Sequence, residues 1–323
     1  MRGAHNVGDA IKWSALRRRR VAVLFGGPSS EREISIRTAA AVRRALGRMG
    51  LRHTVLEVSP RLPDSLRRER IDLAFLATHG SVGEDGRLQG LLDVLGIAYT
   101  GSGVRASALA MHKPSAKRIF QSAGLPTPRW ALVPAGERVT PHQVGLRLPL
   151  VVKPAEQGSA VGVTVARTLS EFQAGLKAAG RVDPEVLVEE YVSGTEITVG
   201  LLGERILPVV EILPQHAFYD YHSKYAPGGS RHILPARLAP AVYCRSQELA
   251  VAAFHALGCR HVGRVDLMVD RRGRPTLLEV NTLPGLTATS LLPEAARAVG
   301  VNFEDLVGTL LTLALETDGR SAT

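Results

Sequence analysis

The chain has 323 residues, 45% of them hydrophobic and 22% charged, so it is long enough for two or three domains with buried cores. No apolar run approaches the roughly 18 residues that cross a bilayer, and the first twenty residues hold no signal-like apolar stretch, so we expect neither a membrane span nor secretion. Two cysteines, Cys244 and Cys259, are too few for a disulfide framework and match no zinc spacing, which favours reduced thiols in a cytosolic protein.

The net charge of +10 is concentrated toward the start of the chain, where the first twenty residues hold six basic residues and one acidic residue. The four arginines at 17–20 could touch nucleic acid or an anionic membrane. The segment lacks strong periodicity, so we adopt the simpler interpretation of a basic, disordered extension over residues 1–20. The remaining positive charge suits a protein that handles anionic substrates.

Residues 21–112 carry the pattern of a small α/β unit. Its predicted elements are strands at 21–25, 53–58 and 71–77 and helices at 34–49 and 88–95. This order predicts a parallel sheet layered with helices. The loops at 26–33 and 78–86 would follow carboxyl ends of strands, where ligands bind in open α/β sheets.

A boundary near 111–114 is followed by an α+β pattern with antiparallel strands. Its predicted elements are helices at 115–123 and 170–179 and strands at 150–153, 162–166, 186–190 and 196–202. Thr168 and Glu171 form a capping-box pattern before the second helix. The rest of the chain predicts a strand region at 205–212, an aromatic-rich loop at 218–230, a helix at 242–257, a hairpin at 264–280, and helices at 293–299 and 303–316.

The hairpin carries the most informative side chains, namely Asp266, Glu279 and Asn281. The link at 270–274 is short, polar and contains glycine, so the two strands should pair and place both carboxylates side by side. Hard oxygen ligands with an incomplete protein cage suit Mg²⁺ that keeps waters or phosphates in its shell. Taken alone, an exposed hairpin with solvated acids fits the segment equally well.

A glycine-rich loop at 153–162 lies between two predicted strands. Gly158 and Gly162 would let backbone N–H groups approach an anion, and Lys153 could neutralise phosphate charge. The loop is not a Walker A motif, since no Gly-Lys-Ser/Thr ends it. Glycine-rich hairpins are common, so the loop alone is weak evidence.

Acidic residues at a later strand end could serve a nucleotide. Glu189, Glu190 and Glu196 could supply a carboxylate for ribose hydroxyls beside a backbone edge for the base. An ordinary charged strand end is the alternative. Glu31 follows a Gly-Gly turn, where an acid either supports a helix start or holds a substrate ammonium. His79 alone is more often structural.

Lys224 and Tyr225 lie in the aromatic-rich loop, which is more aromatic than a solvated loop needs. The loop could form a lid that excludes water from a reactive intermediate.

Together these segments resemble the D-alanine–D-alanine ligases of the ATP-grasp superfamily. The resemblance runs in order from about residue 21 to about residue 316. Its motifs, as they stand here, are GGPSSEREIS, THGSVGEDGRLQGLL, YTGSGVRASALAMHK, VVKPAEQGSAVGV, VEEYVSGTEITVGLLG, FYDYHSKY, GRVDLMVD and LLEVNTLPGLTATSLLP. So many motifs in one order argue against coincidence.

The resemblance implies an α/β (α+β), three-domain ATP-grasp fold. The implied domains are an N-terminal parallel α/β substrate domain at 21–112, a central ATP-grasp domain at 113–203 and a C-terminal ATP-grasp domain with the metal site at 204–323. ATP would lie between the second and third domains. The implied nucleotide contacts are Lys113 and Lys153 at the phosphates, Gly158 in the loop over them, and Glu189, Glu190 and Glu196 around adenine and ribose. Two Mg²⁺ ions, or Mn²⁺ in their place, would bind Asp266, Glu279 and Asn281.

The resemblance also assigns the substrate residues. Glu31 would hold the ammonium of the first D-alanine, with His79 near its carboxylate. Ser290 and Leu291 would bind the carboxylate of the second D-alanine at a helix start. The implied reaction is ATP-dependent formation of D-alanyl-D-alanine through a D-alanyl phosphate, for peptidoglycan precursor synthesis. The implied setting is a cytoplasmic homodimer that binds neither nucleic acid nor membrane.

The remaining implied roles concern the reacting atoms. Arg264 and the Gly285 N–H would face the developing oxyanion, while Lys224 and Tyr225 would close the lid. Ser159 would sit in the flexible loop over the phosphates. A network that takes the proton of the attacking amine is a hypothesis, and its members would be Glu31, Ser159 and Tyr225.

Four positions depart from the pattern expected of the family: His112, Gln157, Ala160 and Leu283. They put loop closure and ATP affinity in doubt, because none removes an expected metal ligand or catalytic side chain. One alternative is a relative that joins D-alanine to D-lactate or D-serine, although the Lys224-Tyr225 pair favours the dipeptide. A second alternative is a nucleotide-binding protein without catalysis, recruited to nucleic acid by the basic extension.

Overall fold

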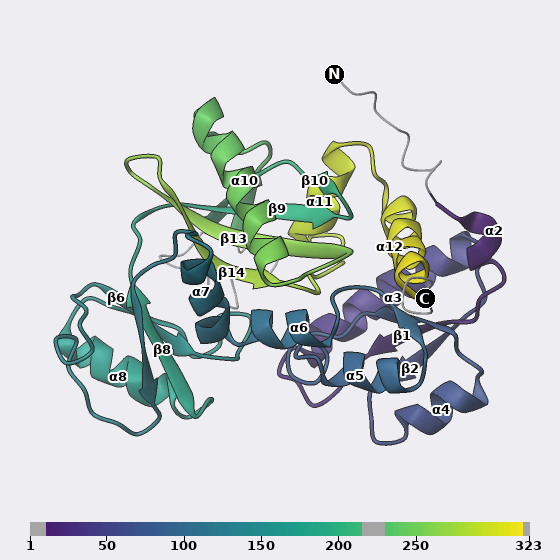
Figure 1. Cartoon of the computed structure of the whole chain (residues 1–323), viewed down its shortest axis with the longest axis horizontal. Helices are drawn as coiled ribbons and strands as arrows, with labels where there is room; N and C mark the ends of the chain where they lie inside the picture. Colours follow the sequence, from purple (N-terminus) through teal and green to yellow (C-terminus); the bar gives the residue numbers. More distant parts are fainter. Residues whose placement is uncertain (1–10, 215–229, 319–323) are drawn as a thin grey trace.

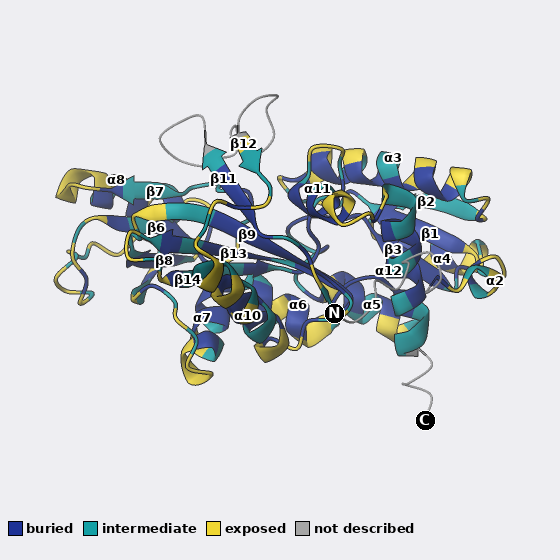
Figure 2. Cartoon of the chain, turned by 90° about the horizontal axis from the view of Figure 1, so that it is seen from above, coloured by how far each residue is buried: buried dark blue, intermediate teal, exposed yellow. Residues whose placement is uncertain are grey.

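The computed structural model describes residues 11–214 and 230–318, which fold around three β-sheets (Figure 1). One sheet is built by the N-terminal third of the chain, one by the middle, and the largest by the strands that follow. Figure 2 places buried residues in the strands and exposed residues on the outward turns of the outer helices.

The N-terminal sheet is parallel and has the order β2-β1-β3-β4. Its strands are β1 (Val21–Phe25), β2 (His53–Glu57), β3 (Leu73–Leu76) and β4 (Ala98–Tyr99). The first four residues of β1 are completely buried, which explains why its sequence is apolar without alternation. The three predicted strands and their parallel arrangement are confirmed.

Helices α3 (Arg32–Arg48), α4 (Leu62–Arg68) and α5 (Arg87–Val94) connect these strands. Only α4 was absent from the prediction. Strands β2 and β3 lie on either side of β1 and run parallel to it, so the chain must cross from one side of β1 to the other, and α4 lies in that crossover connection. This short helix buries just two residues, Leu62 and Leu66, so its sequence shows little apolar periodicity.

The middle sheet is antiparallel, with the order β5-β8-β6-β7. Its strands are β5 (Trp130–Pro134), β6 (Leu150–Pro154), β7 (Thr164–Ala166) and β8 (Glu185–Glu190). The predicted helix is α8 (Leu169–Ala179), and its capping box is present, because Thr168 accepts from the Glu171 N–H and Glu171 accepts from the Thr168 N–H. The half-buried strand β5 was not predicted.

The third sheet has the order β12-β11-β9-β13-β14, with β10 paired to β9. Its strands are β9 (Gly194–Leu202), β10 (Arg205–Ile206), β11 (Val210–Pro214), β12 (Ser230–Ile233), β13 (Val262–Asp270) and β14 (Pro275–Asn281). Helices packed against it are α6 (Val104–Met111), α7 (Lys113–Ser122) and α10 (Pro240–Ala256). The sequence grouped β9 with the middle segment, whereas its hydrogen bonds place it in this sheet.

The last two helices, α11 (Leu291–Ala298) and α12 (Phe303–Asp318), lead back to the N-terminal sheet. Helix α12 contacts α3, β3 and β4, and its apolar residues share one core with β1 and α3. Among the described residues no single helix is long and apolar enough to cross a bilayer; Leu291–Ala298 and Phe303–Thr317 meet that test as a pair, but they are bent by 103°.

The prediction of a disordered extension is wrong for residues 11–20. Helix α2 (Trp13–Leu16) lies in this segment, and Ile11 and Leu16 are 6% and 0% exposed. Both belong to the core that α12 completes. The Lys12 N–H donates to Thr312 Oγ1 at 3.2 Å, and its ammonium lies 2.9 Å from Glu316. Apolar side chains among the basic residues therefore anchor the segment.

Candidate active site

The hairpin predicted to carry a metal site is confirmed as β13 and β14. Asp266 lies directly opposite Glu279, and Arg264 opposite Asn281, in an antiparallel register. The register shifts immediately after Asp266, which marks a bulge. The turn is closed by Asp270, whose carboxylate accepts from the Arg272 and Arg274 N–H groups. The predicted pairing of the two carboxylates is therefore correct.

The oxygens of these residues already have protein partners. Asp266 Oδ1 accepts from Arg264 Nε at 2.9 Å and from Thr198 Oγ1 at 2.6 Å, and Oδ2 accepts from Arg264 Nη2 at 2.8 Å. Asn281 Oδ1 accepts from the Leu283 N–H at 3.1 Å. Glu279 lies 3.8 Å from the Lys113 ammonium.

This donor set fits Mg²⁺. Within residues 11–214 and 230–318 no three His, Cys, Asp or Glu residues cluster as a metal cage. Two carboxylates and an amide oxygen form an incomplete, all-oxygen set, which suits a cation that draws its other ligands from water and phosphates. The metal residues stay a prediction from the sequence that this geometry supports.

A pocket between the middle and third sheets collects the predicted nucleotide residues. Those that line it are Lys113, Lys153, Gly158, Glu189, Glu190 and Glu196, together with Asp266 and Glu279. Apolar side chains from both sheets form its walls, namely Val151, Val163, Ile212, Leu213, Met268 and Leu278. Apolar walls with polar groups at one end suit a flat base joined to charged phosphates.

A buried ion cluster lies behind this pocket. The Glu189 carboxylate bonds Lys153 through Oε1 and lies 2.7 Å from Lys117 Nζ through Oε2. Burial alone would raise the pKa of Glu189, but the two lysines outweigh it and hold that pKa below its ordinary value. Burial lowers the pKa of Lys117 to about 8, against the opposing pull of Glu189. Sequence reasoning missed Lys117.

The glycine-rich loop reaches from the middle sheet to the N-terminal unit. A Cβ at Gly158 would lie 2.6 Å from Glu31 Oε2, so a larger residue there would push the Glu31 carboxylate aside. Ser159 and Ala160 both have positive φ, 51° and 57°, which bends the loop sharply. Lys113 Nζ donates to the Gln157 carbonyl at 2.6 Å and holds the loop from below.

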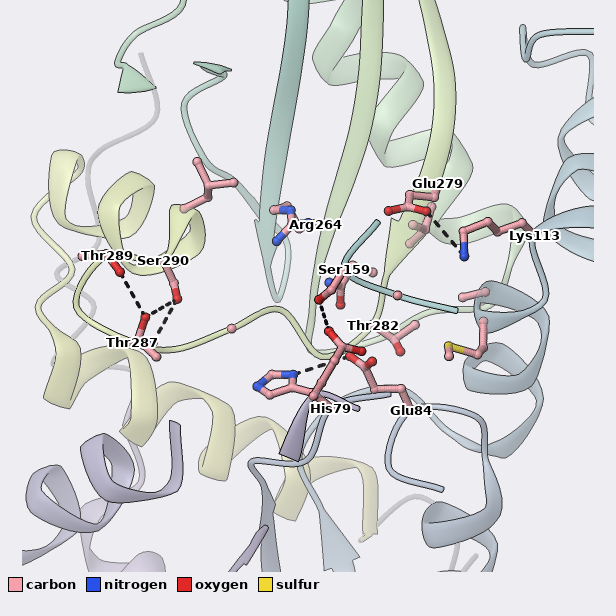
Figure 3. Close-up of a pocket in the computed structure, with 18 residues that line it drawn as sticks. His79, Glu84, Lys113, Ser159, Arg264, Glu279, Thr282, Thr287, Thr289 and Ser290 are labelled. Carbon is pink, nitrogen blue, oxygen red and sulfur yellow. Dashed lines mark hydrogen bonds and ion pairs between the residues drawn. The ribbon is translucent and has the colours of Figure 1, made fainter. Parts of the chain in front are cut away.

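A second pocket lies on the other side of this loop (Figure 3). The predicted substrate residues that line it are Glu31, His79, Ser159, Arg264, Gly285, Ser290 and Leu291. Ser159 Oγ donates to Glu31 Oε1, so one edge of the predicted proton network is present. Its third member, Tyr225, and its neighbour Lys224 lie outside the described residues.

Glu84 is a residue of this pocket that sequence reasoning missed. It accepts from the Gly80 N–H at 2.6 Å and lies 3.8 Å from His79 Nδ1. Burial raises the pKa of Glu84, Glu31 adds to the rise, and His79 opposes it. The motif THGSVGEDG contained the signal, since an acid near a histidine in a ligand-facing loop is a candidate partner. His79 is further held by Thr38 Oγ1, 3.1 Å from Nε2.

The far end of the pocket is the start of α11. Ser290 is the residue before the helix, and its Oγ accepts from the Thr287 N–H at 3.0 Å. Gly285 lies close to this hydroxyl, because a Cβ there would be 3.1 Å from it. The first backbone N–H groups of a helix can bind an anion, and Ser290 and Leu291 at this helix start line the pocket.

Of the four departures from the family pattern, His112 has the clearest structural role. It caps α7, accepting at Nδ1 from the Ser115 N–H at 3.3 Å, and its Nε2 lies 2.9 Å from Glu185. Since Nδ1 accepts, Nε2 carries the proton. The departure at position 112 therefore keeps a side-chain cap on α7.

The chain is similar to known protein families and to proteins of known sequence and structure. The family model "D-ala D-ala ligase C-terminus" matches residues 119–312, and "D-ala D-ala ligase N-terminus" matches residues 59–102. A D-alanine–D-alanine ligase of Geotalea uraniireducens is 46% identical over 299 residues, covering 93% of this chain and 96% of the relative. One of Trichlorobacter lovleyi is 48% identical over 293 residues, covering 90% and 94%.

Solved structures agree with the sequence comparison. The ligase of Bacillus anthracis complexed with ATP superimposes with a TM-score of 0.83 at 31% identity, covering 94% of this chain and 99% of that one. The ligase of Coxiella burnetii gives 0.80 at 26% identity, covering 94% and 96%. The fold is thus the ATP-grasp fold. The chain belongs to the D-alanine–D-alanine ligase family.

Proposed function

We propose that the chain joins two D-alanines into D-alanyl-D-alanine, with ATP converted to ADP and phosphate, to supply peptidoglycan precursors. The observation that carries this is the junction of the two pockets: Lys113, Gly158, Ser159 and Glu279 line both. A phosphoryl group held on one side therefore lies next to a substrate held on the other.

The first step makes the substrate carboxylate reactive. A carboxylate is a poor acyl donor, because its leaving group would be oxide. Its oxygen attacks the γ-phosphorus, the bond to the β–γ bridging oxygen breaks, and ADP leaves an acyl phosphate. Lys113 and Lys153 offset the repulsion between carboxylate and triphosphate, and Glu31 holds the substrate ammonium. Mg²⁺ held by Asp266, Glu279 and Asn281 would supply further neutralisation of phosphate charge when bound.

The second step forms the peptide bond. The amine of the second D-alanine attacks the acyl carbon, the oxyanion forms, and the C–O bond to phosphate then breaks. Arg264 and the Gly285 N–H stabilise the oxyanion, a role often worth about 3 kcal/mol. Ser290 and the Leu291 N–H hold the second carboxylate, and His79 lies by the first.

A free α-amine has a pKa of about 8, so it is mostly protonated at neutral pH. The attacking amine must therefore lose a proton. We assign this proton transfer to the network of Glu31, Ser159 and Tyr225. Replacing Tyr225 by phenylalanine should alter the pH–rate profile. An unchanged profile would remove Tyr225 from the network.

The deciding experiment measures phosphate release from ATP with Mg²⁺ and D-alanine, with L-alanine, D-serine and D-lactate as added partners. Release with D-alanine alone, and D-alanyl-D-alanine as product, is expected. Release that requires D-lactate or D-serine would instead identify a ligase with a different second substrate. Absence of release with every partner would leave a nucleotide-binding protein without this reaction.

The setting of the enzyme is part of the proposal. We propose a cytoplasmic homodimer that needs neither nucleic acid nor membrane, built of domains at 21–112, 113–203 and 204–323. The molar mass from light scattering should be twice that of one chain. Salt-sensitive DNA binding that disappears when the four arginines at 17–20 are replaced by glutamine would contradict the proposal.

A further inference from the structure

The buried ion cluster behind the nucleotide pocket contains more positive than negative side chains. Two lysines, Lys117 and Lys153, share the single carboxylate of Glu189, so the cluster carries one surplus positive charge. A buried surplus charge is costly unless a partner neutralises it. The exposed side of the cluster is the pocket, which Lys153 and Glu189 line.

Lys117 does not itself reach that pocket. Its side chain is 0% exposed, and it is not among the described residues that line either pocket. Its ammonium donates to Thr127 Oγ1 at 2.7 Å, and Thr127 in turn donates to the Leu277 carbonyl of β14 at 3.0 Å. The lysine is thus fixed by α7, β8 and β14 together, without contact with a ligand.

Charge balance then gives Lys117 a function. If Glu189 paired with Lys153 alone, the pair would be neutral and would attract a phosphate weakly. Because Lys117 neutralises Glu189 from behind, the charge of Lys153 stays available on the pocket side. Glu189 meanwhile keeps the Lys153 ammonium in place.

We propose that Lys117 is a positioning residue for phosphate binding: it neutralises Glu189, so that Lys153 presents a full positive charge to the nucleotide phosphates. This inference rests on the proposed function, because it assumes that the pocket holds ATP.

The test compares ATP with adenosine, which lacks phosphates, by calorimetric titration in the presence of Mg²⁺. The ratio of the two affinities isolates the phosphate contribution. Lys117→Met should lower this ratio roughly tenfold, which corresponds to the loss of one interaction between charges across a few ångströms. Lys117→Arg, which keeps the charge, should retain it. Lys177→Met, an exposed lysine on α8, serves as the matched control and should leave the ratio unchanged.

A double variant separates charge balance from packing. In the double variant Lys117→Met with Glu189→Gln, a neutral amide replaces the carboxylate. No negative charge then offsets Lys153, so the ratio should recover. A merely structural role of Lys117 would give no recovery, and that result would overturn the inference. So would an unchanged ratio in Lys117→Met. Should Lys117→Met fail to fold, a lowered ratio in Lys117→Arg or in the double variant overturns it as well.

The two proposals fail in different ways. Wild-type protein that does not bind ATP would overturn the proposed function itself. Wild-type protein that binds ATP normally, beside a Lys117→Met variant with the same ratio, would overturn only the role of Lys117.

Discussion

Arg264 and Asp266, two residues apart on β13, form a two-point ion pair in which Nε lies 2.9 Å from Oδ1 and Nη2 2.8 Å from Oδ2. Both side chains are mostly buried, 14% and 9% exposed. Arg264, which would stabilise the oxyanion, therefore takes up both carboxylate oxygens of Asp266, which would bind the metal. A cation bound at Asp266 would therefore compete with Arg264 for the same carboxylate.

Replacing Arg264 by methionine should have opposite effects on metal binding and on rate. Asp266 loses its competing partner, so Mn²⁺ affinity in the absence of nucleotide should rise severalfold, as measured by electron paramagnetic resonance. The turnover number should fall by about 10²- to 10³-fold, because an oxyanion donor is lost.

Arg274 provides the matched control on the same hairpin. It pairs with Asp270 at 2.7 Å and is 68% exposed. Arg274→Met should change neither metal affinity nor rate. Weaker Mn²⁺ binding in Arg264→Met would show that the arginine organises the carboxylate and does not compete for it.

Replacing Ser159 by alanine tests the contact between the phosphate loop and Glu31. The variant removes the hydroxyl that donates to the carboxylate, so kcat/KM for D-alanine should fall by about 10²-fold, in the range of a lost proton-transfer partner. Adenosine affinity should stay unchanged. Ser170→Ala, at an exposed position in α8, is the control. Equal kinetics for the two variants would exclude a role for Ser159 in substrate binding or proton transfer.

Replacing His112 by alanine tests whether the cap of α7 supports ATP binding. Loss of a cap lowers the free energy of unfolding by about 1 kcal/mol. Because Lys113 begins this helix, the variant should also raise KM for ATP severalfold. Thr168→Ala removes the cap of α8 and should cost similar stability with no change in KM. The same KM in both variants would mean that the cap stabilises without positioning Lys113.

Because the pKa of His261 is shifted by folding, we expect the free energy of unfolding to depend on pH. Burial, with help from Arg260, lowers the pKa of His261 from its ordinary value of 6.5 to about 3. Below pH 6.5 the unfolded chain gains a proton that the folded chain excludes, so stability falls as the pH falls toward about 3. At pH 5.5 the loss should be about 1 kcal/mol.

Urea unfolding at pH 7.5 and 5.5 measures this effect. His261 has a positive φ of 63°, which asparagine tolerates well, so His261→Asn is the appropriate variant. It should show less destabilisation between the two pH values than the wild type. An equal loss in both proteins would assign the acid sensitivity to other groups.

The parts of the site that the sequence predicted correctly depend on local pattern. The hairpin was found because strand character flanks a short polar link, and pairing then placed Asp266 opposite Glu279 without further information. The capping box at Thr168 is equally local. Strand β4, with two residues, is too short to show a period.

The parts that sequence reasoning missed depend on distant contacts. In the sequence Lys117 looks like an ordinary helical lysine. Its buried ion-pair partner, Glu189, lies far along the chain. The segment at 11–20 reads as a basic tail, and its order comes from α12, about three hundred residues away. No local period reports either contact.

The return of α12 to the first sheet bears on how the chain folds during synthesis. Leu306, Val307, Leu310 and Leu311 complete the core that Val21, Val23 and Phe75 begin. Domains usually fold in order as they emerge from the ribosome. Here the first unit to emerge would keep an exposed apolar face until the last helix is made. The middle sheet has a core of its own and would be free to fold before it.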